Sequence, residues 1–265
     1  MIDKNSHNII KTINLKIGYQ NKKQLHSVAD KINICLARGQ FTCLLGKNGV
    51  GKSTLLRTLT KVQPKLEGDI FIEERELEAI ENIDLAKKMS LVLTEKIPES
   101  NLTVYELIAL GRQPYTNWIG SLTDIDKNHI DIAITQTHIE EIAHKKYNEL
   151  SDGQLQKVMI ARTLAQNTDI IILDEPTAHL DIQNKVEIYK LLKTLSKQHQ
   201  KTILISSHEI QLGLLLADEL WLMNDNGIIS GKTENLIANG SVSSLFTSDL
   251  VTFDVKSKQF VINTD

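Results

Sequence analysis

Between residues 46 and 54 the chain reads Gly-Lys-Asn-Gly-Val-Gly-Lys-Ser-Thr, and these residue types suit the binding of a nucleoside triphosphate. The spacing matches the phosphate-binding loop, G-x-x-x-x-G-K-[ST]. Glycines let backbone N–H groups close around phosphates, and the following helix adds the positive end of its dipole. We expect Lys52 to reach the β- and γ-phosphates and Ser53 to place its hydroxyl on Mg²⁺. The candidate nucleotide-binding positions here are Gly46, Asn48, Gly49, Gly51, Lys52, Ser53 and Thr54.

Two carboxylates form the second candidate group. Asp174 and Glu175 follow the apolar run Ile170–Leu173, which is typical of a buried strand. A carboxylate at such a strand end is the expected partner of Mg²⁺ beside a phosphate loop, and the second carboxylate is placed to orient and deprotonate a water. The alternative is that the two acidic residues only begin a loop.

Two further side chains have positions that suit a ligand site. His208 follows a predicted strand over 202–206, and a side chain at the carboxyl end of such a strand faces the ligand crevice. Tyr19, placed between the first two predicted strands, has two interpretations of equal weight. Its ring could stack on adenine, or it could pack on the sheet as a strand-end residue.

The elements that must position these residues follow from periodicity and capping signals. A short apolar strand over 41–45 precedes the phosphate loop, and leucines at helical spacing follow it. Thr103 and Glu106 have the spacing of a capping box, and a second amphipathic helix is predicted over 124–144. Further along, the patterns predict a helix beginning near Ser151, a helix over 182–195, a hairpin over 220–230, a helix over 233–238 and a terminal hairpin after 250.

Length and composition restrict the class of protein. The 265 residues are enough for one large domain, alone or with a small extra lobe, and the 41% apolar and 24% charged fractions are ordinary for a soluble protein. The net charge of −3 supplies no overall positive field for nucleic acid. Cys35 and Cys43 are interpreted as small core residues, since nothing indicates a secretory context.

The chain has no apolar signal-peptide stretch near Met1 and no apolar run approaching 18 residues. We therefore expect a cytoplasmic protein that does not span a membrane by itself. Six histidines stand in mostly polar surroundings without ligand spacing and are interpreted as surface residues, so no zinc or haem site is expected: His7, His26, His129, His138, His144 and His199.

Taken in order, these residues resemble an ATP-binding cassette (ABC) ATPase over residues 9–240. The resemblance implies an α/β fold with a P-loop NTPase core, a mainly parallel sheet, an antiparallel β subdomain and a helical subdomain over residues 96–165. Residues 1–240 would form the cassette and 241–265 an extension. The matching positions are Tyr19, the phosphate loop, Leu150–Gln154 as the LSGGQ-type signature, Leu173–Glu175, Ala178–Asp181 as the D-loop and His208 as the switch histidine.

The resemblance also implies partners. Two copies would pack head to tail with two ATP molecules between them, so that Ser151, Gly153 and Gln154 of one copy close on the nucleotide held by the other. An integral membrane permease, and through it a substrate-binding protein, would place the protein at the cytoplasmic face of the cell membrane. No nucleic-acid partner is expected.

Residues 102–115 are similar to a T-V-x-E-L…G-R-x-P-Y run of the subgroup that serves iron–siderophore, haem and cobalamin importers. In the family this region docks on the permease; the alternative is a capped surface helix with a proline-terminated exit. The resemblance thus favours an ATP-hydrolysing importer subunit for a metal chelate. The particular substrate is not encoded here, because the permease and its binding protein select it.

Three residues depart from the family pattern. Thr94-Glu95 stands where a glutamine that contacts Mg²⁺ is usual, so Glu95, or the hydroxyl of Thr94, would take that place. Asp152 replaces a glycine of the signature, and Glu209 follows His208 where aspartate is usual. None of the three removes a residue needed for hydrolysis.

Two other functions remain compatible with the cassette. An exporter ATPase uses the same chemistry, and only the resemblance of residues 103–115 argues against it. A soluble ABC ATPase acting on nucleic acid or ribosomes would carry long coiled-coil arms or a second cassette. Here about a hundred residues without heptads separate the phosphate loop from the signature.

Overall fold

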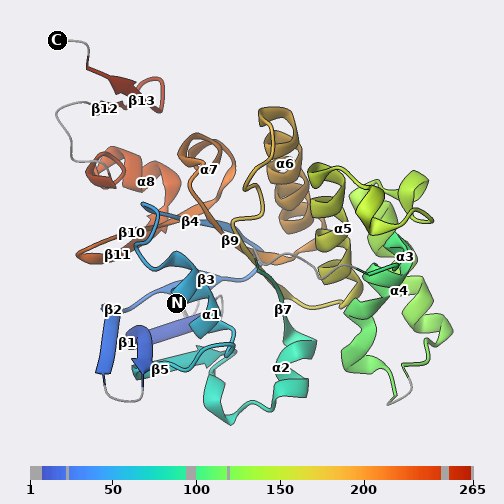
Figure 1. Cartoon of the computed structure of the whole chain (residues 1–265). Helices are drawn as coiled ribbons and strands as arrows, with labels where there is room; N and C mark the ends of the chain where they lie inside the picture. Colours follow the sequence, from blue (N-terminus) through green and yellow to red (C-terminus); the bar gives the residue numbers. More distant parts are fainter. Residues whose placement is uncertain (1–7, 22–23, 94–99, 118–119, 246–250, 264–265) are drawn as a thin grey trace, which may run out of the picture. The chain divides into compact units, whose positions relative to one another are not determined.

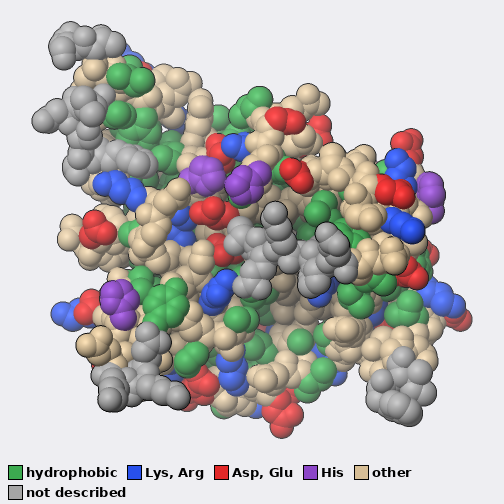
Figure 2. All heavy atoms as spheres, in the orientation of Figure 1, with side chains coloured by type: hydrophobic (Ala, Val, Ile, Leu, Met, Phe, Trp, Pro, Cys, Tyr) green, Lys and Arg blue, Asp and Glu red, His purple; other side chains and the backbone are tan. Residues whose placement is uncertain are grey.

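The computed structural model describes residues 8–21, 24–93, 100–117, 120–245 and 251–263. The chain forms two compact units: one contains residues 1–80 and 193–265, the other residues 81–192. Strands and helices occur in both, so the predicted α/β class is confirmed (Figure 1). On the face shown in Figure 2, acidic and basic side chains are interspersed among the described residues.

An antiparallel sheet makes up the N-terminal part of the first unit, with the strand order β2-β1-β5-β6 and β3 paired to β1. Leu15, Ile17, Ile32 and Leu36 are buried in this sheet, whereas Ile13 is 36% exposed. The bounds are β1 Asn8–Asn21, β2 Gln24–Ile32, β3 Cys35–Ala37, β5 Glu67–Ile72 and β6 Arg75–Glu76. Tyr19 lies within β1, so its predicted position between two strands was wrong.

A second sheet of this unit has the order β11-β10-β4-β9, in which β4 is parallel to both β9 and β10. Every residue of β4 and of β9 is buried, which explains their unbroken apolar runs. The bounds are β4 Phe41–Leu45, β9 Thr202–Ser207, β10 Glu219–Asn224 and β11 Gly227–Lys232. This sheet carries the phosphate loop at the end of β4.

Short helices accompany the sheets of the first unit: α1 Lys52–Leu59, α7 Ile210–Leu216, α8 Thr233–Ala238, and the 3₁₀ turns η1 Leu77–Ala79 and η5 Ser243–Leu245. Helix α7 approaches β4 closely, since a Cβ on Gly213 would stand 3.2 Å from the sulfur of Cys43. Cys43 is buried as predicted, whereas Cys35 is only half-buried. The terminal strands β12 Val251–Asp254 and β13 Gln259–Ile262 pair antiparallel.

The second unit is mainly helical, with one parallel strand pair, β7 Met89–Val92 and β8 Ile170–Asp174. Helices α3 and α4 both pack on α5. The helices are α2 Asn82–Lys88, α3 Val104–Ala109, α4 Asp124–Thr137, α5 Asp152–Ala165 and α6 Ile182–His199, and the unit boundary falls inside α6. The 3₁₀ turns are η2 Leu110–Tyr115, η3 Glu140–Ile142 and η4 Tyr147–Glu149.

Three helices of this unit begin with capping boxes. The box predicted at Thr103 is present, and Ser151 caps α5 in the same way. A third box joins Thr123 to Asp126 at the start of α4. The helix predicted over 124–144 is shorter than expected, because His138 adopts a left-handed conformation (φ 54°) that ends α4.

Among the helices within the described residues, none combines the length and the apolar composition that crossing a membrane requires.

Candidate functional site

The phosphate loop connects β4 to α1, and its backbone needs glycine at the predicted positions. Gly49 and Gly51 have positive φ values of 79° and 112°, a region that favours glycine. A Cβ on Gly46 would stand 2.4 Å from the backbone oxygen of Met223, and one on Gly51 would stand 2.3 Å from Cγ1 of Val28. Gly46 and Gly51 therefore have no room for a side chain.

Lys52 is the first residue of α1 and is only 4% exposed. Its Nζ donates hydrogen bonds to the carbonyl oxygens of Gly46 and Lys47, at 3.0 and 3.2 Å. The side chain thus curls back across the loop that its own backbone helps to form. An ammonium group and a helix N-terminus at one place make a site suited to an anion such as phosphate.

Tyr19 is joined to this loop from the antiparallel sheet. Its side chain is 48% exposed, and its hydroxyl lies 2.7 Å from Oγ1 of Thr54 in a hydrogen bond. Of its two interpretations, packing of the ring on the sheet does not fit this exposure, and stacking on adenine stays a prediction. The exposed ring lies close to the first turn of α1.

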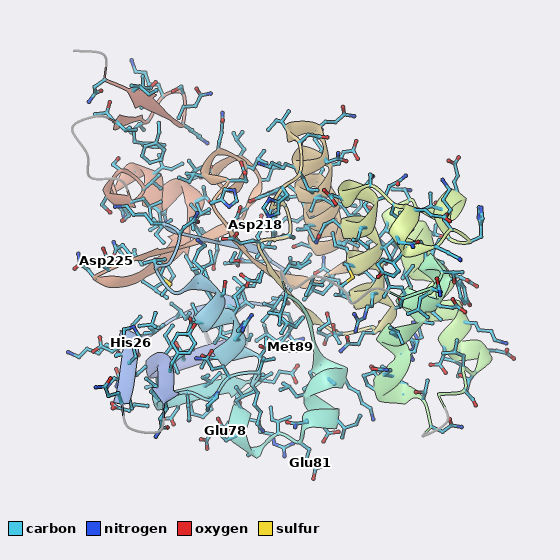
Figure 3. The ribbon with its side chains drawn as sticks, in the orientation of Figure 1. His26, Glu78, Glu81, Met89, Asp218 and Asp225 are labelled. Carbon is cyan, nitrogen blue, oxygen red and sulfur yellow. The ribbon has the colours of Figure 1, made fainter. Side chains whose placement is uncertain are left out.

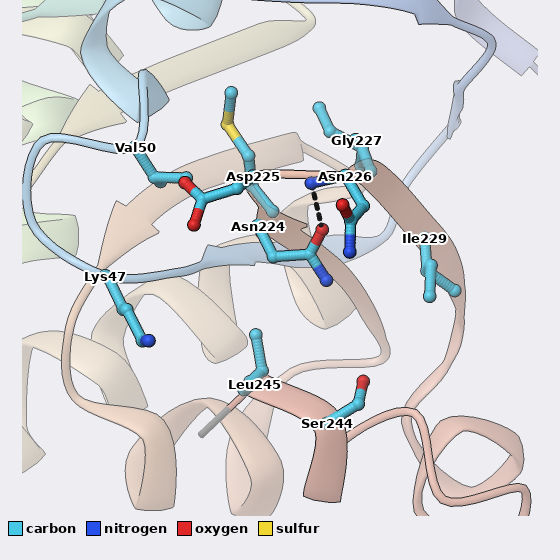
Figure 4. Close-up of a pocket in the computed structure, with 11 residues that line it drawn as sticks. Lys47, Val50, Asn224, Asp225, Asn226, Gly227, Ile229, Ser244 and Leu245 are labelled. Atoms are coloured by element: carbon cyan, nitrogen blue, oxygen red, sulfur yellow. Dashed lines mark hydrogen bonds between the residues drawn. The ribbon is translucent and has the colours of Figure 1, made fainter. Parts of the chain in front are cut away.

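A cavity of about 430 Å³ flanks the other residues of the loop (Figure 4). Lys47 and Val50 line it together with the turn at Asn224–Gly227, where Oδ1 of Asn224 accepts a hydrogen bond from the backbone N–H of Asn226. Its lining does not include Tyr19, Lys52, Ser53 or Thr54. This cavity is therefore distinct from those four predicted binding residues, and Asn48 is exposed at the loop tip.

His208 follows β9 in the same unit and is exposed in part. Its Nε2 lies 3.2 Å from Oε1 of Glu209, the residue that departs from the family pattern. The backbone N–H of Glu209 donates to Oγ of Ser207, which fixes the turn after the strand. The structure thus places His208 at the carboxyl end of a fully buried parallel strand, as predicted.

In the second unit, the signature residues form the N-terminus of α5. Oγ of Ser151 accepts a hydrogen bond from the backbone N–H of Gln154, and Oε1 of Gln154 accepts one from the backbone N–H of Ser151. A hydroxyl that accepts one bond can still donate its own hydrogen. Gly153 is buried, and a Cβ there would stand 2.5 Å from Oδ1 of Asn184.

Asn184 is a contact that sequence reasoning missed. Its backbone N–H and its side-chain amide both donate to Asp181, which lowers the pKa of that carboxyl. The signature and the end of the D-loop are therefore joined through one side chain. Only a D-x-x-N spacing at the start of a predicted helix could have indicated the link.

Asp174 and Glu175 occupy the end of β8. Asp174 is only 2% exposed. Glu175 has a positive φ of 47°, and His179 in the D-loop has one of 65°. Such conformations cost energy for residues with a side chain, and they gather at functional sites. A backbone bond from Ala178 to the carbonyl of Glu175 closes the turn, at 3.0 Å.

Each unit offers one hard oxygen donor of the kind Mg²⁺ prefers. In the first unit it is the hydroxyl of Ser53, and in the second it is the buried carboxylate of Asp174. Within the described ranges no group of three or more His, Cys, Asp or Glu could hold a metal ion. Mg²⁺ usually keeps several waters and phosphate oxygens among its ligands. Thr94 and Glu95 lie outside the described residues.

Comparison with known proteins identifies the family. The family model for ABC transporters matches residues 29–178. An uncharacterized ABC transporter ATP-binding protein of Methanocaldococcus jannaschii is 38% identical over 90% of this chain and 81% of its own length. The chain belongs to the ABC transporter ATP-binding proteins.

Further relatives of the cassette carry more specific names. A petrobactin import ATP-binding protein of Bacillus subtilis is 36% identical over 83% of the cassette chain and 86% of its own length. A transporter assigned to the metal-chelate ABC type, solved in an inward-facing conformation, has a TM-score of 0.77 at 25% identity and covers 90% of this chain and 89% of its own.

The fold and the reaction class of the cassette are also supported by a structure of another cassette. The dimeric, post-hydrolysis form of an ATP-binding cassette with bound ADP and phosphate has a TM-score of 0.72 at 26% identity, covering 84% of this chain and 98% of its own. The predicted ABC ATPase fold is confirmed, and the chain is an ATP-binding cassette ATPase.

Proposed function

We propose that this cassette is the ATP-hydrolysing subunit of an importer, which couples cassette dimerisation to the uptake of a metal chelate through a membrane permease. The observation that carries the proposal is the similarity to import proteins, since the relatives are named for petrobactin and for iron(3+)-hydroxamate import. The cargo is an iron–siderophore, haem or cobalamin. Residues 1–240 form the cassette, and 241–265 form an extension.

The roles of the side chains in the first unit follow from their positions. Lys52 holds the β- and γ-phosphates, supported by its burial against loop carbonyls. Tyr19 stacks on the adenine ring, supported by its exposed ring and its bond to Thr54. His208 contacts the γ-phosphate from the end of β9. Ser53 would hold Mg²⁺, which neutralises developing charge on the phosphates when bound.

In the second unit, Asp174 would hold the same ion through water, and Glu175 orients and deprotonates the attacking water. Glu95 remains a prediction as a further ligand. Ser151, Gly153 and Gln154 close on the γ-phosphate held by the partner cassette, supported by their place at the N-terminus of a fourteen-residue helix. The ATP site is therefore completed by a second copy in a head-to-tail arrangement.

The docking region for the permease is residues 103–115. Support comes from an exposed aromatic ring held in a fixed place: the guanidinium of Arg112 lies over the ring of Tyr115, with 4.0 Å between its carbon and the ring centroid. Aromatic side chains with one exposed face are frequent anchors of protein interfaces. The permease would hold the cassette at the cytoplasmic face of the membrane and connect it to a substrate-binding protein.

Co-purification from native membranes tests the proposal. The tagged cassette is solubilised gently, and the proteins that accompany it are identified and quantified. We expect a polytopic permease at equal stoichiometry, and Tyr115→Ala should reduce its recovery while ATP binding is retained. Lys190→Ala, an exposed change on α6, is the matched control. Recovery of nucleic acid or ribosomes without a permease would refute the transport function and leave the ATPase intact.

A further inference from the structure

We propose that His26 is a second base-contacting side chain, which widens the platform beside Tyr19 so that the cassette favours a purine over a pyrimidine nucleotide. The inference rests on the proposed function, because it adds a specificity-determining residue to the same nucleotide site. Neither the phosphate-loop motif nor the position of Tyr19 assigns a role to His26.

The register of the antiparallel sheet places the two side chains together. In the β1–β2 pair, Tyr19 stands directly opposite His26, which is labelled in Figure 3. Residues that face each other across an antiparallel pair point to the same side of the sheet, with Cβ atoms about 4.5–5.5 Å apart. Tyr19 and His26 therefore form one surface made from two strands.

A contact from each strand brings this part of the sheet to the phosphate loop. On β1, the Tyr19 hydroxyl bonds Oγ1 of Thr54 in the first turn of α1. On β2, Val28 reaches the loop, since its Cγ1 would meet a Cβ on Gly51 at 2.3 Å. The register shifts at Val28, so the side on which His26 lies follows from its pairing with Tyr19 and not from alternation along β2. Both strands thus approach the residues that hold phosphate.

Exposure leaves the surface open to a ligand. His26 is exposed, and Tyr19 is 48% exposed although its hydroxyl is engaged. A base that stacks on Tyr19 would extend from a point beside Thr54. His26 stands opposite Tyr19 on the neighbouring strand β2, within the reach of a bicyclic ring.

The chemistry of the two rings gives them different tasks. Stacking on tyrosine tolerates any base, because every base has a π-face. The single ring of a pyrimidine can be covered by Tyr19 alone, whereas the two rings of a purine extend further and contact the imidazole as well. His26 therefore favours ATP over CTP, and it adds nothing to the binding of the triphosphate itself.

Calorimetric titration of the full chain with ATP, CTP and inorganic tripolyphosphate tests the proposal. In His26→Ala we expect ATP affinity to fall about 5- to 10-fold, near the lower limit for a lost base contact. CTP and tripolyphosphate should change by less than about twofold, and His26→Phe should restore ATP affinity through its ring. The matched control is Leu25→Ala, since Leu25 is exposed on the adjacent position of β2 and faces the other side.

The outcomes separate the possible failures. Equal weakening of all three ligands would mean that His26 only supports the loop, and unchanged ATP affinity would mean that it does not touch the base; either result overturns the proposal. Tyr19→Ala should weaken ATP and CTP alike. A wild-type protein that binds neither ATP nor tripolyphosphate would overturn the nucleotide site, whereas absence of a permease in co-purification would overturn only the transport function.

Discussion

A buried ion pair beside residues 103–115 yields a quantitative prediction. Nε of Arg112 donates to Oδ1 of Asp126 at 2.8 Å, and Nη1 donates to the carbonyl of Ala165 at the same distance. Both side chains are about 3% exposed. Asp126→Asn keeps the shape of the side chain but removes its charge. The Arg112 guanidinium then stays buried beside a neutral amide in place of a carboxylate. Breaking a buried pair from one side costs about 3–5 kcal/mol.

The expected loss for Asp126→Asn is about 3 kcal/mol, at the lower end of that range, because Ala165 and the ring of Tyr115 still contact the guanidinium. Thr123→Ala should cost about 1 kcal/mol, since it removes the cap of α4 and one hydrogen bond to the Asp126 carboxylate. The double variant Arg112→Met/Asp126→Asn should be more stable than Asp126→Asn alone, because no buried charge remains unpaired.

Urea unfolding of the three variants, together with hydrogen exchange of peptides covering α3, α4 and η2, measures these losses. Exchange should rise in those peptides and stay unchanged in β4 and α1, which belong to the other unit. If Asp126→Asn costs less than about 1 kcal/mol, or if the double variant is no more stable than Asp126→Asn, the reasoning from burial is refuted.

Three more predictions follow from the site and its surroundings. Glu175→Gln should bind ATP, hydrolyse it at least about 100-fold more slowly and elute as a dimer in size-exclusion chromatography with ATP; a monomeric, fully active variant would contradict the assigned role. Gly51→Ala should abolish ATP binding, because the added Cβ meets Val28 at 2.3 Å at a φ of 112°, whereas Gly49→Ala should weaken it less because nothing lies within 4 Å of its Cβ; titration of both variants with ATP compares them. Hydrogen bonds from Thr123, together with Arg112, lower the pKa of Asp126 from 3.8 to about 2. Its contribution to stability is therefore present above about pH 4 and lost as the pH falls toward 2, so the stability gap between wild type and Asp126→Asn should narrow over that range.

The features that the sequence predicted well are local. The phosphate loop and the capping boxes at Thr103 and Ser151 are set by residues within a few positions of each other. The Thr123–Asp126 box has the same kind of signal and could have been predicted from its spacing. The end of α4 could not, because Ile139 and Ile142 continue the helical apolar spacing and are still buried after His138 turns the chain.

Contacts between distant segments were not predictable from one sequence. The bond from Arg112 to Ala165 spans 53 residues, and the pairing of Tyr19 with His26 depends on the register of two strands. A shift of one residue in that register would turn His26 to the other side of the sheet. The polar residues around His26 in the sequence led to its interpretation as a surface residue. Polar surroundings suit a residue that faces a ligand equally well.

Asp152 shows how the structure distinguishes the two middle positions of the signature, where glycine is usual. Asp152 is the first residue of α5, exposed, and not among the residues of the described chain with a positive φ. A negative charge in the first turn of a helix is favourable, so an aspartate there is compatible with the helix it begins. Gly153 differs, because its Cβ would stand 2.5 Å from Asn184. Asp152 therefore replaces glycine at a position where the backbone does not need it. The glycine that remains, Gly153, is the one that packs against Asn184 of α6.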